Sequence, residues 1–401
     1  MNTKCSVLAL LLFLGTTPSN IAHAQQGQQA LPAPSESELL VPTISHMQIA
    51  RKTFGTAVID GKVYVSGGHG GPSHSRNIDH QLQSTEVYDP ETQAWQTLEP
   101  RIHSAYGYGM VSYDDQLVAF GGFSYQRNDS GIALRGSASF IEAFDPAVGE
   151  RGRWQVRPTE LPDPRSSHRV VALDNLVYLI GGWQVEPNKG MGPYVNNVDV
   201  YDLTKQEFVP SAHHLPALSK AGTVASNAKD QSENPGMRAF AACSTPNNTI
   251  IVAGGNKASP GGLIPMNKVM EFDPAKPADK AWRNLPDLPV VLFGPSATVT
   301  NGWLVVAGGY GGQEGAGHRG WKYRKTVHGL RYKEPGATWR VLGHLSEGKG
   351  FTETVTVDSR RFMVIGGNIV DPTRQVPSPR TPGTTTAFTG ASDRAEMFTV
   401  N

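Results

Sequence analysis

The sequence predicts an all-β protein made of six similar repeats. The first observation is an apolar run that ends in a Gly-Gly pair and recurs six times. The second is a turn-forming dipeptide shortly before each run, and the third is a further β-rich segment after it. The pairs end at Gly68, Gly122, Gly182, Gly255, Gly309 and Gly367. Self-similarity at such intervals is typical of repeat architectures.

Each repeat begins with two strands joined by a short turn. Asn, Asp and Gly tolerate positive φ, so they suit two-residue hairpins. The apolar run after the turn forms the second strand, and its terminal Gly-Gly allows packing where a side chain would clash. The turn dipeptides are Asp60-Gly61, Asp114-Asp115, Asp174-Asn175, Asn247-Asn248, Asn301-Gly302 and Asp358-Ser359.

A third strand follows each Gly-Gly pair, and a fourth carries an aromatic residue. Third strands include TEVYDP ending at Pro90, IEAFDP ending at Pro146 and VDVYDL ending at Leu203. The fourth-strand aromatics are Trp95, Trp154, Phe208, Trp282 and Trp339. The double glycine, the Tyr-Asp and the spaced Trp resemble the kelch repeat. This resemblance implies a six-bladed β-propeller over residues 38–401, with one four-stranded blade per repeat.

The sixth repeat stops at Asn401, after its third strand. Residues 38–43 (ELLVPT) align with the fourth-strand segment of the other repeats. We predict that this N-terminal strand completes the last blade, because an unclosed ring would leave a long unpaired edge.

Residues 1–24 have the features of a secretory signal peptide. Lys4 precedes an apolar run, residues 7–14, and Ala22-His23-Ala24 has the A-x-A pattern of a cleavage site. We predict export to the periplasm or extracellular space, with residues 25–37 as a flexible lead-in. An uncleaved N-terminal anchor is the alternative. No other apolar run approaches the length of a membrane span, so none is expected beyond the signal.

The composition argues against several classes of protein. The 401 residues contain 36 Lys and Arg against 35 Asp and Glu, which argues against a nucleic-acid binder. Charged residues are 18% and hydrophobic residues 38%, so the chain is not expected to be disordered by charge. Cleavage would remove Cys5 and leave Cys243 as the sole cysteine, so no intramolecular disulfide is expected.

The strand order places the long connections on one face. They are residues 69–84, 123–139, 183–196, 256–266, 310–325 and 368–391, together with 209–237. Loops on a rigid scaffold commonly carry binding sites. On this face, around the mouth of the central channel that the first strands of the repeats line, we predict ligand contacts. They come from Arg51, Arg165, His168, Trp183, Arg238, Asn256, Lys349 and Asn368. Arginine suits carboxylates, and aromatics suit a sugar ring, so the expected ligand is a small anionic or sugar-like molecule. Structural ion pairs between blades are the alternative for the arginines.

Two constellations raise the question of a metal. His69, His74 and His80 share one loop with Asp79, and imidazole with carboxylate can bind zinc or copper. Cys243 lies between apolar neighbours, which favours a buried thiol. Copper radical oxidases such as galactose oxidase are also kelch propellers, and they imply a Cys–Tyr crosslink, a second Tyr and two His. No matching set can be placed here, so we predict no metal and no cofactor.

Three functions stay open. The chain resembles secreted N-acetylneuraminate epimerases in its signal peptide and kelch blades. Asn256, however, stands where that family has a Glu after the mid-chain glycines, and no Arg follows. An isomerase or lyase could instead use His69 or Tyr310 as base, with Arg238 neutralising a carboxylate. The alternatives are a non-catalytic propeller that binds a protein or peptide partner, and a copper radical oxidase.

Overall fold

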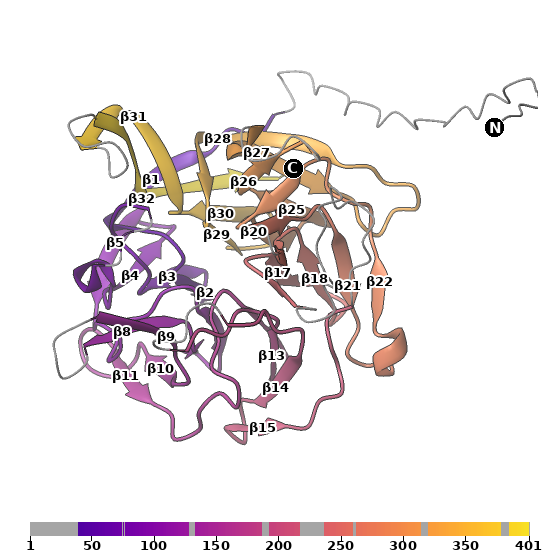
Figure 1. Ribbon diagram of the computed structural model, residues 1–401, viewed down its shortest axis with the longest axis horizontal. Helices are drawn as coiled ribbons and strands as arrows, with labels where there is room; N and C mark the ends of the chain where they lie inside the picture. The colour runs from indigo at the N-terminus through magenta and orange to yellow at the C-terminus, as the bar shows by residue number, and fades with distance from the viewer. Residues whose placement is uncertain are drawn as a thin grey trace, which may run out of the picture. The chain divides into compact units, whose positions relative to one another are not determined.

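The repeats fold into sets of four antiparallel strands in a computed structural model. It describes residues 39–73, 75, 77–127, 133–186, 192–216, 236–259, 262–313, 320–377 and 385–400. The predicted signal peptide and lead-in lie outside the described residues. All described elements belong to one unit, residues 33–401. Figure 1 shows its sheets arranged around a common centre, with β2, β17 and β29 close to it.

The strands of each set are paired in chain order. The first repeat contains β2 (Gly55–Ile59), β3 (Lys62–Ser66), β4 (Thr85–Asp89) and β5 (Ala94–Leu98). The second contains β6 (Gly109–Tyr113), β7 (Gln116–Phe120), β10 (Ile141–Asp145) and β11 (Arg153–Val156). The third contains β12 (Arg169–Leu173), β13 (Leu176–Ile180), β14 (Val198–Asp202) and β15 (Glu207–Val209).

The later repeats follow the same order. The fourth contains β17 (Ala241–Ser244), β18 (Ile250–Ala253), β21 (Val269–Phe272) and β22 (Trp282–Asn284). The fifth contains β24 (Ser296–Thr300), β25 (Trp303–Ala307), β27 (Lys322–Leu330) and β28 (Arg340–Gly350). The sixth contains β29 (Glu353–Thr356), β30 (Arg361–Ile365) and β32 (Thr385–Thr399), and β32 also pairs with β1 (Thr43–Arg51).

The N-terminal strand lies later in the sequence than expected. Thr43, predicted as the last residue of the pairing segment, is the first residue of β1 and lies opposite Met397 of β32. Leu40 instead lies beside β28, where its N–H donates to the carbonyl of Leu342 at 2.7 Å. Glu86 of β4 then accepts the N–H of Gln48 at 2.7 Å, which joins β1 to the first repeat.

The first turn of a repeat has two residues in four cases. The flanking pairs are Ile59↔Lys62, Tyr113↔Gln116, Leu173↔Leu176 and Thr300↔Trp303. Asp60, Asp114, Asp174 and Asn301 have positive φ, as the turn chemistry predicts. In the fourth and sixth repeats the flanking pairs are Ser244↔Ile250 and Thr356↔Phe362, so those turns are longer than the minimal ones we predicted.

The long connections form additional strands. They are β8 (Phe123–Arg127), β9 (Ala133–Ser137), β16 (Met237–Arg238), β19 (Asn256–Ser259), β20 (Gly262–Pro265), β23 (Val291–Phe293), β26 (Tyr310–Gly312) and β31 (Asn368–Pro377). Two 3₁₀ turns, η2 (Ile78–His80) and η4 (Ala278–Lys280), complete the described secondary structure. No described helix is long and apolar enough to cross a membrane.

Two circuits of backbone hydrogen bonds join the repeats. In the first, the N–H of the second glycine of each pair donates to a carbonyl of another repeat, at 2.8–2.9 Å. The acceptors, in order from Gly68, are Ala105, Arg165, Met237, Leu292, Lys349 and Arg51. In the second circuit, the residue two positions before the first strand of each repeat donates its N–H to the carbonyl of its counterpart in the preceding repeat. The bonds run from Gly107 to Thr53, Ser167 to Gly107, Ala239 to Ser167, Gly294 to Ala239, Phe351 to Gly294, and Thr53 to Phe351.

The hydrophobic core lies between neighbouring sheets. The inner strands contact one another in the order β2, β6, β12, β17, β24, β29, and β29 also contacts β2. Trp154 of the second repeat packs on Phe144 at 5.2 Å between ring centroids, and its indole donates to Thr85 of the first repeat at 3.1 Å. Trp154, a fourth-strand aromatic, therefore fills space between two sheets, and the fold is a β-propeller.

Replacing Gly182 with alanine should weaken the fold. The added Cβ would lie 2.8 Å from Cβ of His168 and 3.0 Å from the carbonyl oxygen of Ser166, at a φ of 112°. We expect Gly182→Ala to lower the free energy of unfolding by about 2 kcal/mol or more, measured by urea denaturation.

Gly149→Ala is the matched control. Gly149 also has a positive φ, 73°, but an added Cβ there would meet nothing within 4 Å. A loss equal to that of Gly182→Ala would show that the close approach of Gly182 to Ser166 and His168 contributes nothing beyond backbone strain.

Candidate functional site

The residue after each Gly-Gly pair lies opposite a residue that precedes an inner strand. These six pairs form one layer, which we call the mouth. The pairs are Lys52↔His69, Tyr106↔Phe123, Ser166↔Trp183, Arg238↔Asn256, Phe293↔Tyr310 and Gly350↔Asn368. Directly opposite residues of a ladder have their side chains on the same face. The structure therefore places His69, Trp183, Arg238, Asn256, Tyr310 and Asn368 in the same layer, as the sequence suggested.

Three other predicted ligand residues are buried ion-pair partners. Arg51 and Arg165 have no exposed surface and pair with Glu86 and Asp199 of their own repeats. Lys349, also fully buried, lies 2.7 Å from Glu396. These contacts support the structural alternative and correct the expectation that the three cations face the mouth. The reason is the position of each cation in its extended segment. Each stands directly before a mouth residue, so its side chain points to the opposite side.

His168 is also placed away from the mouth. It is 2% exposed, and burial lowers its pKa to about 3, so it is neutral at pH 7. Neither ring nitrogen has a hydrogen-bond partner in the described part of the chain. Ser167, between the mouth residue Ser166 and His168, has a φ of 53°, so the backbone turns there and His168 lies in the interior.

Arg238 has no carboxylate partner among the described residues, unlike the buried cations below it. Its guanidinium carbon lies 4.3 Å from the ring centre of Trp183, 5.0 Å from that of Tyr194 and 5.5 Å from that of Phe293. Arg135 of β9 lies over the same Trp183 ring at 5.4 Å. Two guanidinium groups thus share one indole.

The amide of Asn256 adds hydrogen-bonding capacity beside Arg238. Its Nδ2 donates to the hydroxyl of Tyr194 at 3.2 Å. Asn256 is fully buried, and its Oδ1 has no partner among the described residues, nor does Nε of Arg238. A buried donor and a buried acceptor on directly opposite residues can be satisfied by a ligand carrying both kinds of group.

Lys52 is the second cation at the mouth with no carboxylate beside it in the described part of the chain. Its Nζ donates to the carbonyl of Gly71 at 2.9 Å and to Oδ1 of Asn368 at 3.2 Å. The residue is 8% exposed, and burial lowers its pKa to about 7. Lysine in this environment titrates near neutral pH, well below its usual range.

His69 lies opposite Lys52 and is 3% exposed. Burial, followed by the charge of Lys52, lowers its pKa to about 4. Its Nδ1 accepts the N–H of Gly71 at 3.2 Å, so the hydrogen of the neutral ring is on Nε2, which has no partner within the described residues. At pH 7 the ring is therefore a neutral donor.

Tyr310 is linked to Asn368 through Tyr323, which contacts both residues. Its ring is 5.0 Å from that of Tyr323, whose hydroxyl accepts from Nδ2 of Asn368. Burial raises the pKa of Tyr323, which keeps its hydroxyl protonated. A role for Tyr310 or His69 as base stays a prediction.

The histidine loop forms no cluster of metal ligands among the described residues. The rings of His69 and His80 lie 5.6 Å apart, and Nδ1 of His80 is bonded to the hydroxyl of Ser75 at 2.7 Å. His74 lies outside the described residues. Cys243 is buried, and burial raises the pKa of its thiol to about 12, which disfavours a reactive thiolate.

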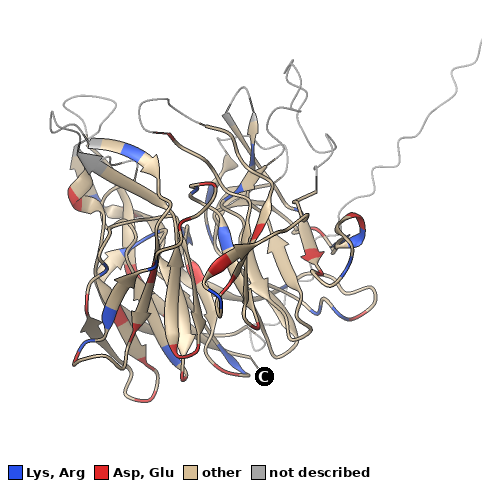
Figure 2. Ribbon diagram, turned by 90° about the horizontal axis from the view of Figure 1, so that it is seen from below, with Lys and Arg blue, Asp and Glu red and all other residues tan. Residues whose placement is uncertain are grey.

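An ion pair joins the inner strands of the third and sixth repeats behind the mouth. Nη1 of Arg169 lies 2.6 and 2.8 Å from the two carboxylate oxygens of Glu353. Burial is the main cause that raises the pKa of Glu353, and Arg169 opposes it. Figure 2 shows that basic and acidic residues are interspersed over the strands. None of the paired residues that define the mouth is acidic.

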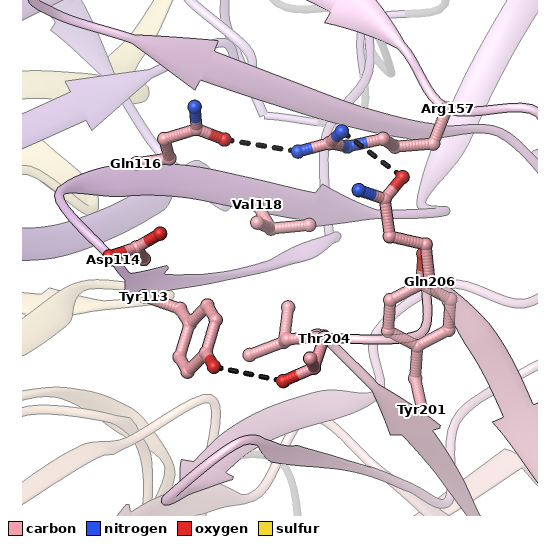
Figure 3. Close-up of a pocket in the computed structure, with 9 residues that line it drawn as sticks. Tyr113, Asp114, Gln116, Val118, Arg157, Tyr201, Thr204 and Gln206 are labelled. Atoms are coloured by element: carbon pink, nitrogen blue, oxygen red, sulfur yellow. Dashed lines mark hydrogen bonds between the residues drawn. The ribbon is translucent and has the colours of Figure 1, made fainter.

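A separate pocket of about 330 Å³ lies between the second and third repeats, at the end of the strands with the short turns. Arg157 donates to the side-chain oxygens of Gln116 and Gln206 along one wall, and Tyr113 is bonded to Thr204 along the other (Figure 3). None of the predicted site residues lines it.

Four residues that shape the site were not predicted from the sequence: Lys52, Arg135, Tyr194 and Tyr323. Lys52 could have been found from the sequence, because it holds the position equivalent to Arg238: each stands two residues before a phenylalanine, Phe54 or Phe240, that directly precedes an inner strand. The other three come from strands and loops that only tertiary pairing brings to the mouth.

Lys52 should make stability depend on pH. Its pKa is about 7 in the folded protein and 10.5 when unfolded, so between these values the unfolded chain binds the extra proton. Relative to Lys52→Met, the wild type should therefore lose stability as pH falls from 10 to 7, by up to about 1.4 kcal/mol per pH unit, and stay level below 7. Urea unfolding of both proteins across this range measures the difference; a constant difference would mean that Lys52 stays charged.

The sequence is similar to several kelch proteins. Beta-scruin of Limulus polyphemus is 26% identical over 184 residues, which are 44% of this chain and 18% of that protein. Kelch-like protein 25 of Xenopus tropicalis is 29% identical over 138 residues, 34% of this chain and 21% of that protein. The F-box/kelch-repeat protein At1g67480 of Arabidopsis thaliana is 36% identical over 81 residues, 20% of each. The matched segments span about a fifth of these relatives.

A solved structure, that of YjhT, shares the fold. It superimposes with a TM-score of 0.60 over 86% of this chain and 95% of that chain, at 17% sequence identity. Residues 53–309 also match the KLHDC2/KLHL20/DRC7 Kelch-repeats domain. Because this match covers more than half of the sequence, the chain belongs to the kelch-repeat family that the double glycines indicated.

Proposed function

We propose that the protein binds a small anionic, sugar-like molecule at the mouth. One observation carries the proposal. Arg238 and Arg135 share the Trp183 ring, and neither forms an ion pair with a described carboxylate. By contrast, Arg51, Arg165 and Lys349 each have one.

Electrostatics supports an anion at this place. Two positive charges beside one indole repel each other. A carboxylate between them would attract both and so offset the repulsion. Arginine presents forked donors that match a carboxylate, and Nε of Arg238 has no partner among the described residues. The ligand would therefore complete the pairing that acidic side chains complete elsewhere in the fold.

The neighbouring groups favour a polyhydroxylated ligand. Oδ1 of Asn256 is a buried acceptor that a hydroxyl could satisfy. Tyr310, a partly exposed residue of the mouth, offers apolar ring surface on which the C–H face of a sugar can pack. A uronate or another sugar acid combines a carboxylate, hydroxyls and such a face.

Arg238→Gln should weaken binding of a sugar acid. We expect a loss of affinity of about 10- to 100-fold for glucuronate or gluconate, since a hydrogen bond to a charged group contributes about 1.5–3 kcal/mol. Titration calorimetry at low and high salt measures it, and salt should weaken the wild type more than the variant.

Arg157→Gln is the matched control, because Arg157 lies in the separate pocket with amide partners (Figure 3). It should leave affinity unchanged. Equal affinity in the wild type and Arg238→Gln, or no binding of any acid in the panel, would contradict the proposed site and favour the protein-binding alternative.

We further propose that this binding takes place outside the cytoplasm. The support is the signal-like sequence of residues 1–24, with its basic start, apolar run and A-x-A end.

A further inference from the structure

We propose that Lys52 is a nucleophile that forms an imine with a carbonyl carbon of the ligand. The inference rests on the proposed function and extends it, because it adds a carbonyl group to the features of the ligand. A 2-keto acid or the open-chain aldehyde of an acidic sugar supplies both a carboxylate and a carbonyl.

The hydrogen bonds of Lys52 match those of a neutral amine. Such an amine has two N–H donors and one lone pair, and Nζ has two neutral acceptors, Gly71 O at 2.9 Å and Asn368 Oδ1 at 3.2 Å. The hydroxyl of Ser73 donates to the same Oδ1 at 2.7 Å, which fixes that atom as an acceptor. With both N–H groups engaged, the lone pair is directed away from the acceptors and is free to attack.

The surroundings of Lys52 also favour the neutral form. No described carboxylate pairs with it, it is 8% exposed, and burial holds its pKa at about 7. Lys349 is the internal contrast, because it is fully buried and has a carboxylate partner, Glu396, at 2.7 Å. A desolvated lysine is the form that attacks carbonyl carbons in proteins.

His69 is placed to assist the reaction. The backbones of Lys52 and His69 exchange two hydrogen bonds of 3.0 and 3.2 Å, so their side chains lie on one face of the ladder. The neutral ring has a hydrogen on Nε2 with no partner among the described residues. That donor can polarise the carbonyl oxygen before attack.

The reaction balances without a further reactant. The lone pair of Nζ forms a bond to the carbonyl carbon as the C=O π electrons move to oxygen. The oxygen takes one proton from the amine and one from solvent and leaves as water. The product is a protonated imine, which keeps one N–H and therefore one of the two hydrogen bonds to Gly71 or Asn368.

Reductive trapping tests the inference. The full chain is incubated at pH 8 with pyruvate or with glucuronate and with sodium cyanoborohydride, which converts the imine to a stable amine. Peptide mass spectrometry should find Lys52 modified at least about tenfold more than Lys62, an exposed lysine paired with Asp89. The two carbonyl compounds distinguish a keto acid from an aldehyde sugar. Modification of Lys62 equal to or above that of Lys52 with both would overturn the inference.

Lys52→Arg is the matched variant, since it keeps a cation and removes the nucleophile. It should abolish the main adduct seen by intact mass; if this variant does not fold, the comparison of Lys52 with Lys62 in the wild type decides alone. Gluconate, an acid without a carbonyl, separates the two proposals. Gluconate binding with no Lys52 adduct overturns the imine alone, whereas an adduct without gluconate binding supports the imine and overturns the anion site.

Discussion

The hydrogen bond from the second glycine of each Gly-Gly pair to the next repeat holds neighbouring sheets together and positions the mouth residues. Its carbonyl acceptor lies close against the first glycine of the pair, where an added Cβ would meet the acceptor oxygen at 2.7 Å at Gly181 and at 3.1 Å at Gly67. Repeated six times, the bond sets the distance between neighbouring sheets. It also determines the mouth, because the residue after the donor glycine and the residue after the carbonyl acceptor are both mouth positions.

This register divides the inner cations into two classes. Arg51, Arg165 and Lys349 are carbonyl acceptors of the glycine bonds, and their side chains turn inward to carboxylates of the third strand. Lys52 and Arg238 stand one residue further along and lie in the layer above. A shift of one residue in an extended segment reverses the direction of the side chain, which accounts for the different surroundings.

The mouth is supported rigidly from below. The closed circuit of backbone bonds through Thr53, Gly107, Ser167, Ala239, Gly294 and Phe351 holds the six mouth segments together. The Arg169–Glu353 ion pair joins two repeats that are not neighbours. A binding group mounted on such a frame loses little conformational freedom when a ligand arrives, and this favours affinity. The same frame holds Lys52 and His69 in one relative position.

The repeats, the turn residues and the aromatic packing could be predicted from the sequence, because double glycines, positive-φ dipeptides and Trp positions are local signals of backbone geometry. The residues after the glycines, such as Trp183 and Asn256, could be placed for the same reason. Which cations have a carboxylate partner depends on the tertiary structure, since Glu86 and Asp199 lie more than thirty residues from the arginines they pair with. Arg135 and Tyr194 reach Arg238 from other repeats, and no local pattern encodes such an encounter.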